Sequence, residues 1–194
     1  MEKITRGRIK RDHLCHEDPM FVGGRCIFGQ CGAAQSHLKN QGVSVGDVFL
    51  FFGLFADEFN GERHHRIFGF LNVDDIVLHS AETAPLHDID YLSRVHPHTL
   101  GDWNTNNTIY HGIGRTAKIA HDGLRLTQPG GPLQHWIVPT WLKDLGLSYH
   151  GKAARWSGSD RLEIVARGQE FVVDIGSQAS ARRWRDHIIG LIEA

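Results

Sequence analysis

The chain has 194 residues, of which 41 % are hydrophobic and 22 % charged, with a formal net charge of -1. A chain of this length buries roughly 70 % of its unfolded surface, so it can fold as one domain without disulfide bonds. Because it has no run of about 20 apolar residues, no signal-peptide pattern and only three cysteines (Cys15, Cys26 and Cys31), we expect a cytoplasmic protein with reduced thiols and no membrane contact.

Residues 1–11 form a basic N-terminal arm, with five Lys or Arg against the single acid Glu2. Clustered basic side chains attract phosphates, so Arg8 and Arg11 of the arm are candidate phosphate ligands, together with Lys118 from the more basic C-terminal half. Charge alone favours a plainer interpretation, a frayed basic terminus on a solvated surface.

The first predicted elements are short strands around one helix. Cys26–Phe28 is a short apolar segment, and the small residues 32–38 after it are suited to open a helix. Val48 to Phe52 is almost continuously apolar, as in a strand covered on both faces. We expect Ile67–Val73 to be the antiparallel neighbour of this strand in the core of one sheet.

The second half of the chain contains weaker strand signals. Thr108–Tyr110 and Leu124–Thr127 are short strand candidates. Arg161–Ala166 and Glu170–Ile175 flank a Gly-containing turn and predict a β-hairpin, in which alternate residues of the second strand share one face.

An amphipathic helix is predicted after Gln178, capped by Ser177 or Ser180 and packed on the sheet. Its apolar residues recur at helical spacing: Trp184, Ile188, Leu191 and Ile192. Strands outnumber helices and no regular βαβ alternation occurs. We therefore predict a single α+β domain over residues 1–194, with a mixed, mostly antiparallel sheet, partly closed in a PUA-like variant, and flanking helices.

Six segments are specific when they are taken together and in order. They are 28–38 (with Phe-Gly-Gln, Gly-Ala-Ala-Gln and His-Leu), 46–53, 65–69, 96–98, 106–110 and 167–172. In this order they resemble the third nucleotide-modification-associated domain family of bacteria and phages. The resemblance implies a role in systems that install, read or attack modified bases in DNA, often in conflict between phage and host. Gly46 and Asp47 before an apolar strand give a fainter likeness to PUA-like readers of modified bases.

The first candidate site is the cluster His16, Glu17 and Asp18. Hydrolysis of an N-glycosidic bond usually needs a carboxylate that positions water and stabilises an oxocarbenium-like state. Asp18 is the first choice for this catalytic role, with His16 or His37 as its neighbour. The alternative is an exposed polar loop that ends at a proline.

The second candidate site lies among glycines and alanines, where the backbone can approach a ligand closely. Gln30, Gln35 and Ser36 offer the donors and acceptors that suit the edge of an extruded base. We expect Gln30, Gln35 and His37 to line one cavity with Asp18. Helix capping and loop attachment are the alternative roles for these side chains.

A third set of residues, all candidates for base binding, follows near the middle of the chain: His98, Asn106, Asn107 and Tyr110. Histidine and asparagine side chains can recognise a base substituent, and a tyrosine ring can stack on a base. Turn formation and core packing are the commoner uses of these residue types.

No cofactor or metal is expected. Cys15, His16, Cys26 and Cys31 lack the spacing of a zinc site, and neither nucleotide-binding loop motif occurs. Our leading hypothesis, reached partly by elimination, is a DNA glycosylase that flips out a hypermodified base and excises it. The alternatives are a non-catalytic reader of modified bases, or an enzyme that modifies bases or nucleotides.

Overall fold

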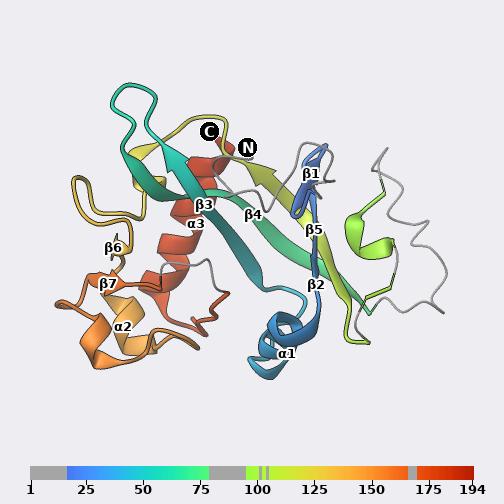
Figure 1. Ribbon diagram of the computed structural model, residues 1–194. Coiled ribbons are helices and arrows are strands. Elements are labelled where there is room, and N and C mark those ends of the chain that lie inside the picture. Colours follow the sequence, from blue (N-terminus) through green and yellow to red (C-terminus); the bar gives the residue numbers. More distant parts are fainter. Residues whose placement is uncertain (1–16, 79–94, 101, 104, 166–169) are drawn as a thin grey trace.

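The computed structural model describes residues 17–78, 95–100, 102–103, 105–165 and 170–194 (Figure 1). Within them the elements follow in this order, with η marking short 3-10 helices: β1 (Met20–Val22), β2 (Arg25–Gln30), α1 (Gly32–Asn40), β3 (Val48–Ala56), β4 (Arg63–Leu78), η2 (Pro97–Thr99), β5 (Thr108–Thr116), η3 (Asp122–Leu124), β6 (His135–Ile137), α2 (Trp141–Leu145), η4 (Ala153–Arg155), β7 (Arg161–Glu163) and α3 (Ala179–Glu193).

A five-stranded antiparallel sheet, in the order β1-β2-β5-β4-β3, organises the molecule (Figure 1). β3 and β4 pair from Val48 opposite Asn72 to Ala56 opposite Arg63, which confirms the predicted pair of neighbours. β6 and β7 form a separate two-stranded sheet. The α+β class is confirmed, but the partial closure expected of the PUA-like variant is not observed. The large sheet is open, with β1 and β3 at its edges.

Successive residues of β3 enter two different hydrophobic cores. Phe49 and Phe51 pack in the core to which α1 contributes Leu38. Leu50 and Phe52 pack in the core that α3 covers. All four side chains are partly buried, so both faces of the strand contribute to its stability. The continuous apolar run therefore predicted correctly a strand that is covered on both sides.

Helix α3 packs on β4 and β5, as predicted. Its deeply buried residues are Ala181, Ile188 and Ile192. The predicted caps are wrong, because the helix begins at Ala179, two residues after Ser177, and Ser180 lies within its first turn. Gln178 is the N-cap, its carbonyl accepts from the Arg182 N–H at 3.1 Å, and its side chain makes no capping hydrogen bond.

The predicted C-terminal hairpin does not form. Arg161–Glu163 is strand β7, but it pairs with β6, and residues 170–175 form no strand. Val172 bonds instead to Ser148: its carbonyl accepts from the Ser148 N–H at 2.9 Å, and its own N–H donates to Ser148 Oγ at 2.7 Å. The alternate apolar residues still pack against one core: Phe171, Val173 and Ile175. The alternation thus predicted the packing and missed the pairing.

The two weaker strand candidates have different outcomes. Thr108–Tyr110 begins β5, the central strand of the sheet. Leu124–Thr127 is not a strand, since its residues make only isolated bridges, Arg125 to Arg66 and Thr127 to Trp136. Because Arg125 and Thr127 bridge to different segments of the chain, no continuous ladder forms.

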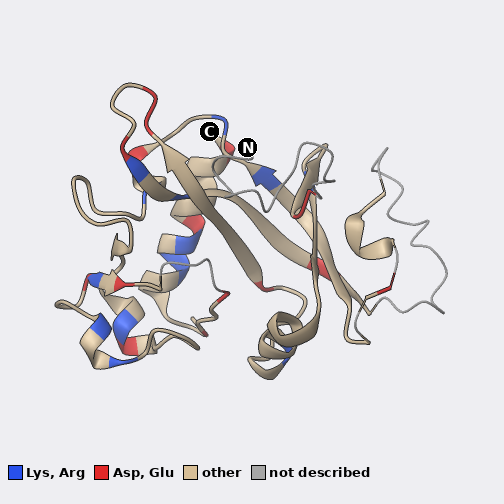
Figure 2. Ribbon diagram, viewed as in Figure 1, with Lys and Arg blue, Asp and Glu red and all other residues tan. Residues whose placement is uncertain are grey.

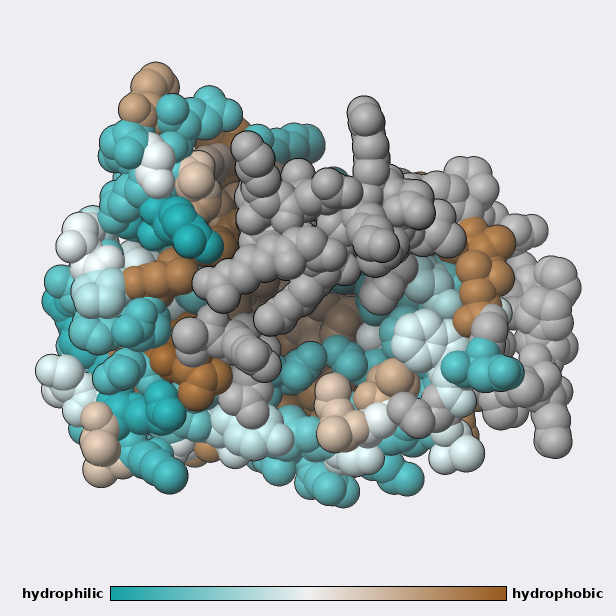
Figure 3. All heavy atoms as spheres, in the orientation of Figure 1, coloured by the Kyte–Doolittle hydropathy of each residue, from teal (hydrophilic) through white to brown (hydrophobic). Residues whose placement is uncertain are grey.

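The surface mixes charges and apolar patches. Among the described residues, Figure 2 shows basic and acidic residues side by side along α3 and around α2. Figure 3 shows hydrophobic residues as separate patches among hydrophilic ones on the face it presents. No helix in the described part of the chain has the length and apolar character needed to cross a membrane.

Candidate active site

The carboxylate of Asp18 is enclosed immediately before the first edge strand, β1. Only 8 % of its side chain is exposed. Its Oδ1 accepts the backbone N–H of Gly29 at 3.1 Å, which fixes the carboxylate against β2. A buried carboxylate is stable only with donors or positive charge around it, so its remaining neighbours define what this site can do.

Two histidines from the η2 turn face this carboxylate. His96 Nε2 lies 3.4 Å from Oδ1 of Asp18, and His98 Nε2 lies 3.4 Å from Oδ2. Both distances are longer than a normal N–H···O hydrogen bond, and among the described residues His96 Nε2 has no hydrogen-bond partner. Both histidines are only 4 % exposed. One carboxylate and two imidazoles therefore converge in a water-poor environment, where electrostatic interactions are strong.

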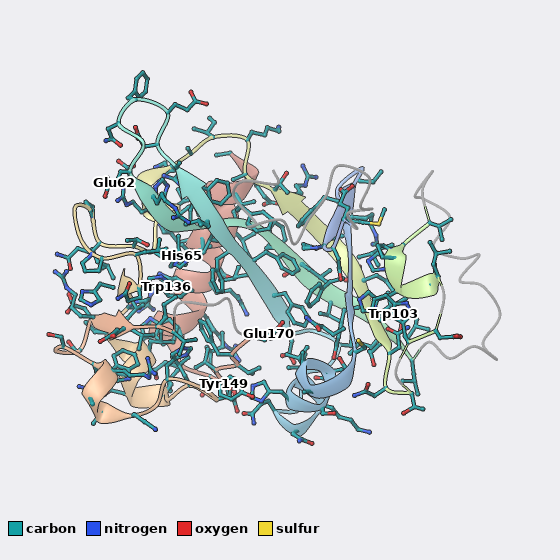
Figure 4. All side chains as sticks on the ribbon, in the orientation of Figure 1. Glu62, His65, Trp103, Trp136, Tyr149 and Glu170 are labelled. Carbon is teal, nitrogen blue, oxygen red and sulfur yellow. The ribbon has the colours of Figure 1, made fainter. Side chains whose placement is uncertain are left out.

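Three neighbours hold the ring of His98. Trp103 stacks on it, with ring centroids 3.9 Å apart and planes at 13° (Trp103 is labelled in Figure 4). Asn107 Oδ1 lies 2.6 Å from His98 Nδ1. Gly29 leaves room for the ring, since a Cβ at this position would overlap Cγ and Cδ2 of His98. Only glycine permits this approach of strand and ring.

His96 is held in one tautomer by its own turn. Its Nδ1 accepts the backbone N–H of His98 at 3.2 Å, so in the neutral ring the proton is on Nε2. A metal-binding imidazole needs a free lone pair on the ligating nitrogen, which His96 Nε2 does not offer in this tautomer. No group of three His, Cys, Asp or Glu residues within the described ranges is arranged to hold a metal ion.

The Cys26 thiol, also close to this site, is unreactive. Burial raises the pKa of Cys26 far above its ordinary value, and the negative charge of Asp18 raises it further. Because the thiolate is the nucleophilic form, Cys26 acts as a small apolar core residue.

Of the two histidines predicted as neighbours of Asp18, only His37 can be placed, and it does not contact the Asp18 carboxylate. His16 lies outside the described residues. His37 is beyond ion-pair distance of Asp18, and its Nε2 bonds to Ser148 Oγ at 2.9 Å. Its ring also stacks on Tyr149, with centroids 4.2 Å apart (Tyr149 is labelled in Figure 4). His37 therefore links α1 to the 148–149 segment.

The expected cavity of Asp18 with Gln30, Gln35 and His37 is wrong in its grouping. Adjacent strand residues point to opposite faces of a sheet, and His98 lies on the Gly29 face. Gln30 is on the other face, where its Nε2 donates to Glu170 Oε1 at 3.0 Å (Glu170 is labelled in Figure 4). The sheet itself thus separates Asp18 from the glutamines.

Gln35 and Tyr110 form a buried pair on the Gln30 face. The Tyr110 hydroxyl donates to Gln35 Oε1 at 3.0 Å, and both residues are at most 5 % exposed. Burial raises the pKa of Tyr110, an effect partly offset by the hydrogen bond with Gln35, so the phenol remains a neutral donor. The pair fixes α1 to β5.

Asn106 and Ser36 fix the start of α1. Asn106 Oδ1 accepts the Gly32 N–H at 2.7 Å, and its Nδ2 donates to the Gly32 carbonyl at 2.8 Å and to Ser36 Oγ at 3.0 Å. Of the third set of predicted residues, only Asn107 and His98 belong to the Asp18 site. Their role in base binding, like that of Asn106, remains a prediction.

Only one of the three phosphate ligands proposed from the charge pattern lies in the described part of the chain, so their grouping remains a prediction. Arg8 and Arg11 lie outside the described residues, and Lys118 is an exposed residue just after β5.

A second polar network lies at the far side of the molecule from Trp103, around Glu62, His65 and Trp136 (Figure 4). There Trp136 Nε1 donates to His65 Nδ1 at 3.1 Å, and Glu62 pairs with Arg125 and accepts the Gly130 N–H.

His96 and Trp103 are functional candidates that sequence reasoning did not assign to the site. The signal for His96 was present in the His96-Pro97-His98 motif, whose first histidine caps η2 while both histidines face Asp18. Nothing in the spacing of residues 18 and 96–98 indicated that they meet.

One comparison with known proteins identifies the chain. The family model described as nucleotide modification associated domain 3 matches residues 1–174, a range that contains Asp18, His96, His98 and the residues around them. Neither the curated proteins nor the solved structures provided a match. The match extends over most of the 194 residues and gives the protein a role linked to modified nucleotides. The chain therefore belongs to the nucleotide modification associated domain 3 family.

Proposed function

We propose that this protein is a DNA glycosylase, which hydrolyses the N-glycosidic bond of a modified base with Asp18 as the catalytic carboxylate. The observation that carries the proposal is the enclosed Asp18 carboxylate with the Nε2 atoms of His96 and His98 each 3.4 Å away. Membership of a nucleotide-modification family supports a modified nucleotide as the substrate.

The chemistry of the site matches the needs of this reaction. When the bond to the base breaks, positive charge develops on the sugar, and a nearby carboxylate stabilises it. The same carboxylate accepts a proton from the attacking water. The Gly29 N–H holds Oδ1 of Asp18 in place, so Oδ2 is the atom better suited to accept this proton. A base in duplex DNA has to be flipped out of the stack before its sugar reaches such a buried group.

The test is base release by the wild type and by Asp18→Asn. Phage genomic DNA with hydroxymethylated or glucosylated bases serves as substrate, and unmodified DNA as the control. Mass spectrometry detects the free base, and alkaline cleavage detects the abasic site. Loss of a group that stabilises transition-state charge lowers the rate by about 100- to 1,000-fold. The amide still offers an oxygen to the Gly29 N–H, so thermal stability should change little.

Asp75→Asn is the matched control. Asp75 also faces a histidine, with its Oδ2 3.3 Å from His111 Nε2, but its side chain is 61 % exposed. We expect this variant to release base at the wild-type rate. Full activity of Asp18→Asn would refute the catalytic role of Asp18. Binding of modified DNA by the wild type without any release would instead establish a reader.

A further inference from the structure

The hydrogen bonds around His98 determine where its protons are. Asn107 Nδ2 donates to the His98 carbonyl oxygen at 2.8 Å, which orients the amide and leaves Oδ1 directed at His98 Nδ1, 2.6 Å away. An amide oxygen only accepts, so His98 Nδ1 carries a hydrogen. The neutral form of His98 with this hydrogen has a lone pair on Nε2.

That lone pair would face a carboxylate oxygen, because His98 Nε2 lies 3.4 Å from Oδ2 of Asp18. Two acceptors facing each other in a buried site repel, and a proton on either atom removes the repulsion. Two charge arrangements meet this need: an imidazolium beside a carboxylate, or a neutral imidazole beside a carboxylic acid. In both, His98 and Asp18 hold one proton between them.

His96 differs from His98 in this respect. Its Nδ1 accepts a backbone N–H, so its Nε2 already carries a hydrogen toward Oδ1 of Asp18 without any added proton. The described residues that titrate close to His98 include Asp18 and His96, whose ring centroid is 5.7 Å from that of His98. Trp103 presents its ring face to His98, which favours a cationic imidazole.

We propose that His98 is the general acid that protonates the leaving base, with Asn107 and Trp103 as its positioning residues. This inference rests on the proposed glycosylase function. The C1′–N bond breaks, its electron pair goes to the base nitrogen, and the proton on His98 Nε2 is transferred to the base. Water then bonds to C1′ and gives its proton to Asp18. Transfer of this proton from Asp18 to His98 restores the starting state, so the cycle balances without an oxidant or cofactor.

The distance between the two groups indicates the order of these steps. Inverting glycosidases place their acid and base roughly 6.5–9.5 Å apart on opposite sides of the sugar. His98 Nε2 lies 3.4 Å from Oδ2 of Asp18, so the two groups are too close to stand on opposite sides of a sugar. The base therefore leaves before water adds, through an oxocarbenium ion that the Asp18 carboxylate stabilises.

The kinetic test is a pH–rate profile of single-turnover base release on the modified DNA that the wild type cleaves. The wild-type rate should fall at alkaline pH, where His98 loses its proton. His98→Gln should be slower by about 100- to 10,000-fold, the usual contribution of a general acid, and its profile should lack the alkaline fall. Trp103→Leu should move the alkaline fall down by about half a pH unit, because the ring face that favours the cation is lost, whereas Trp103→Phe should not. A purely structural role for Trp103 would lower the rate equally at all pH values.

A second measurement does not depend on activity. Long-range ¹H–¹⁵N NMR of the histidine rings should show His96 with its proton on Nε2 and His98 protonated at Nδ1. An Nε2–H tautomer of neutral His98 would overturn the inference, and so would an unchanged alkaline fall in His98→Gln. If the wild type releases no base but the NMR result is as expected, the glycosylase function fails while the proton assignment stands.

Discussion

Gly29→Ala tests whether strand β2 and the His98 ring need their close approach. The added Cβ would overlap two ring atoms of His98 and lie 2.8 Å from its Cβ, whereas ordinary contacts are 3.4–4 Å. Trp103 covers one face of the ring and Asn107 holds Nδ1, so the ring cannot shift without disturbing these contacts. A shift of about 1 Å in a catalytic group lowers the rate roughly 100-fold. Overpacking of this kind costs about 1–3 kcal/mol of stability.

Two assays measure these effects. Thermal unfolding followed by circular dichroism should show a decrease in Tm of about 2–12 °C for a chain of this size. Base release should fall by more than the loss of folded protein explains. Gly53→Ala is the control, since Gly53 lies in strand β3 and a Cβ there would be no closer than 3.3 Å to its neighbours. Wild-type stability and activity of Gly29→Ala would refute the packing on which the site is built.

Three further predictions concern stability. Tyr110→Phe removes the donor to the buried Gln35 Oε1 and should cost about 1–3 kcal/mol in urea denaturation; an unchanged midpoint would contradict the buried pair. Burial lowers the pKa of His65 below its ordinary 6.5, so the unfolded chain binds this proton more readily, and the free energy of unfolding should fall as the pH drops below about 6.5. His65→Asn, which keeps an acceptor for Trp136, should reduce this slope, and an identical slope would assign the effect elsewhere. Asn106→Ala should speed amide hydrogen exchange in the first turn of α1 but not in α3, and equal exchange in α1 would exclude the attachment described here.

Local patterns predicted the parts of the fold that depend on burial. The apolar run at 48–52 and the helical spacing after Gln178 each identified an element whose stability comes from one or two covered faces. Residues 170–175 show the limit of this reasoning. Their alternation matches their packing, but hydrogen bonds to Ser148 replaced the predicted strand pairing.

The candidate site was predictable in its parts and not in its assembly. Asp18 and the His96-Pro97-His98 motif were both singled out from the sequence, yet the contact between them depends on β2 lying between β1 and β5. The glutamines were assigned to the same cavity because they lie among glycines and alanines, where the backbone can approach a ligand closely. Successive residues of a strand point to opposite faces of the sheet, so Gly29 and Gln30 lie toward opposite sides of it.

Helix α3 bears on how this family's folding unit is defined. The family match ends at residue 174, but the core around Ile67 is completed by side chains from residues 181–192. A fragment cut at the end of the matched range would expose the apolar surface that Ile188 and Ile192 now cover. The end of the family match and the end of the hydrophobic core therefore differ by almost twenty residues. Recombinant fragments of this domain should include α3.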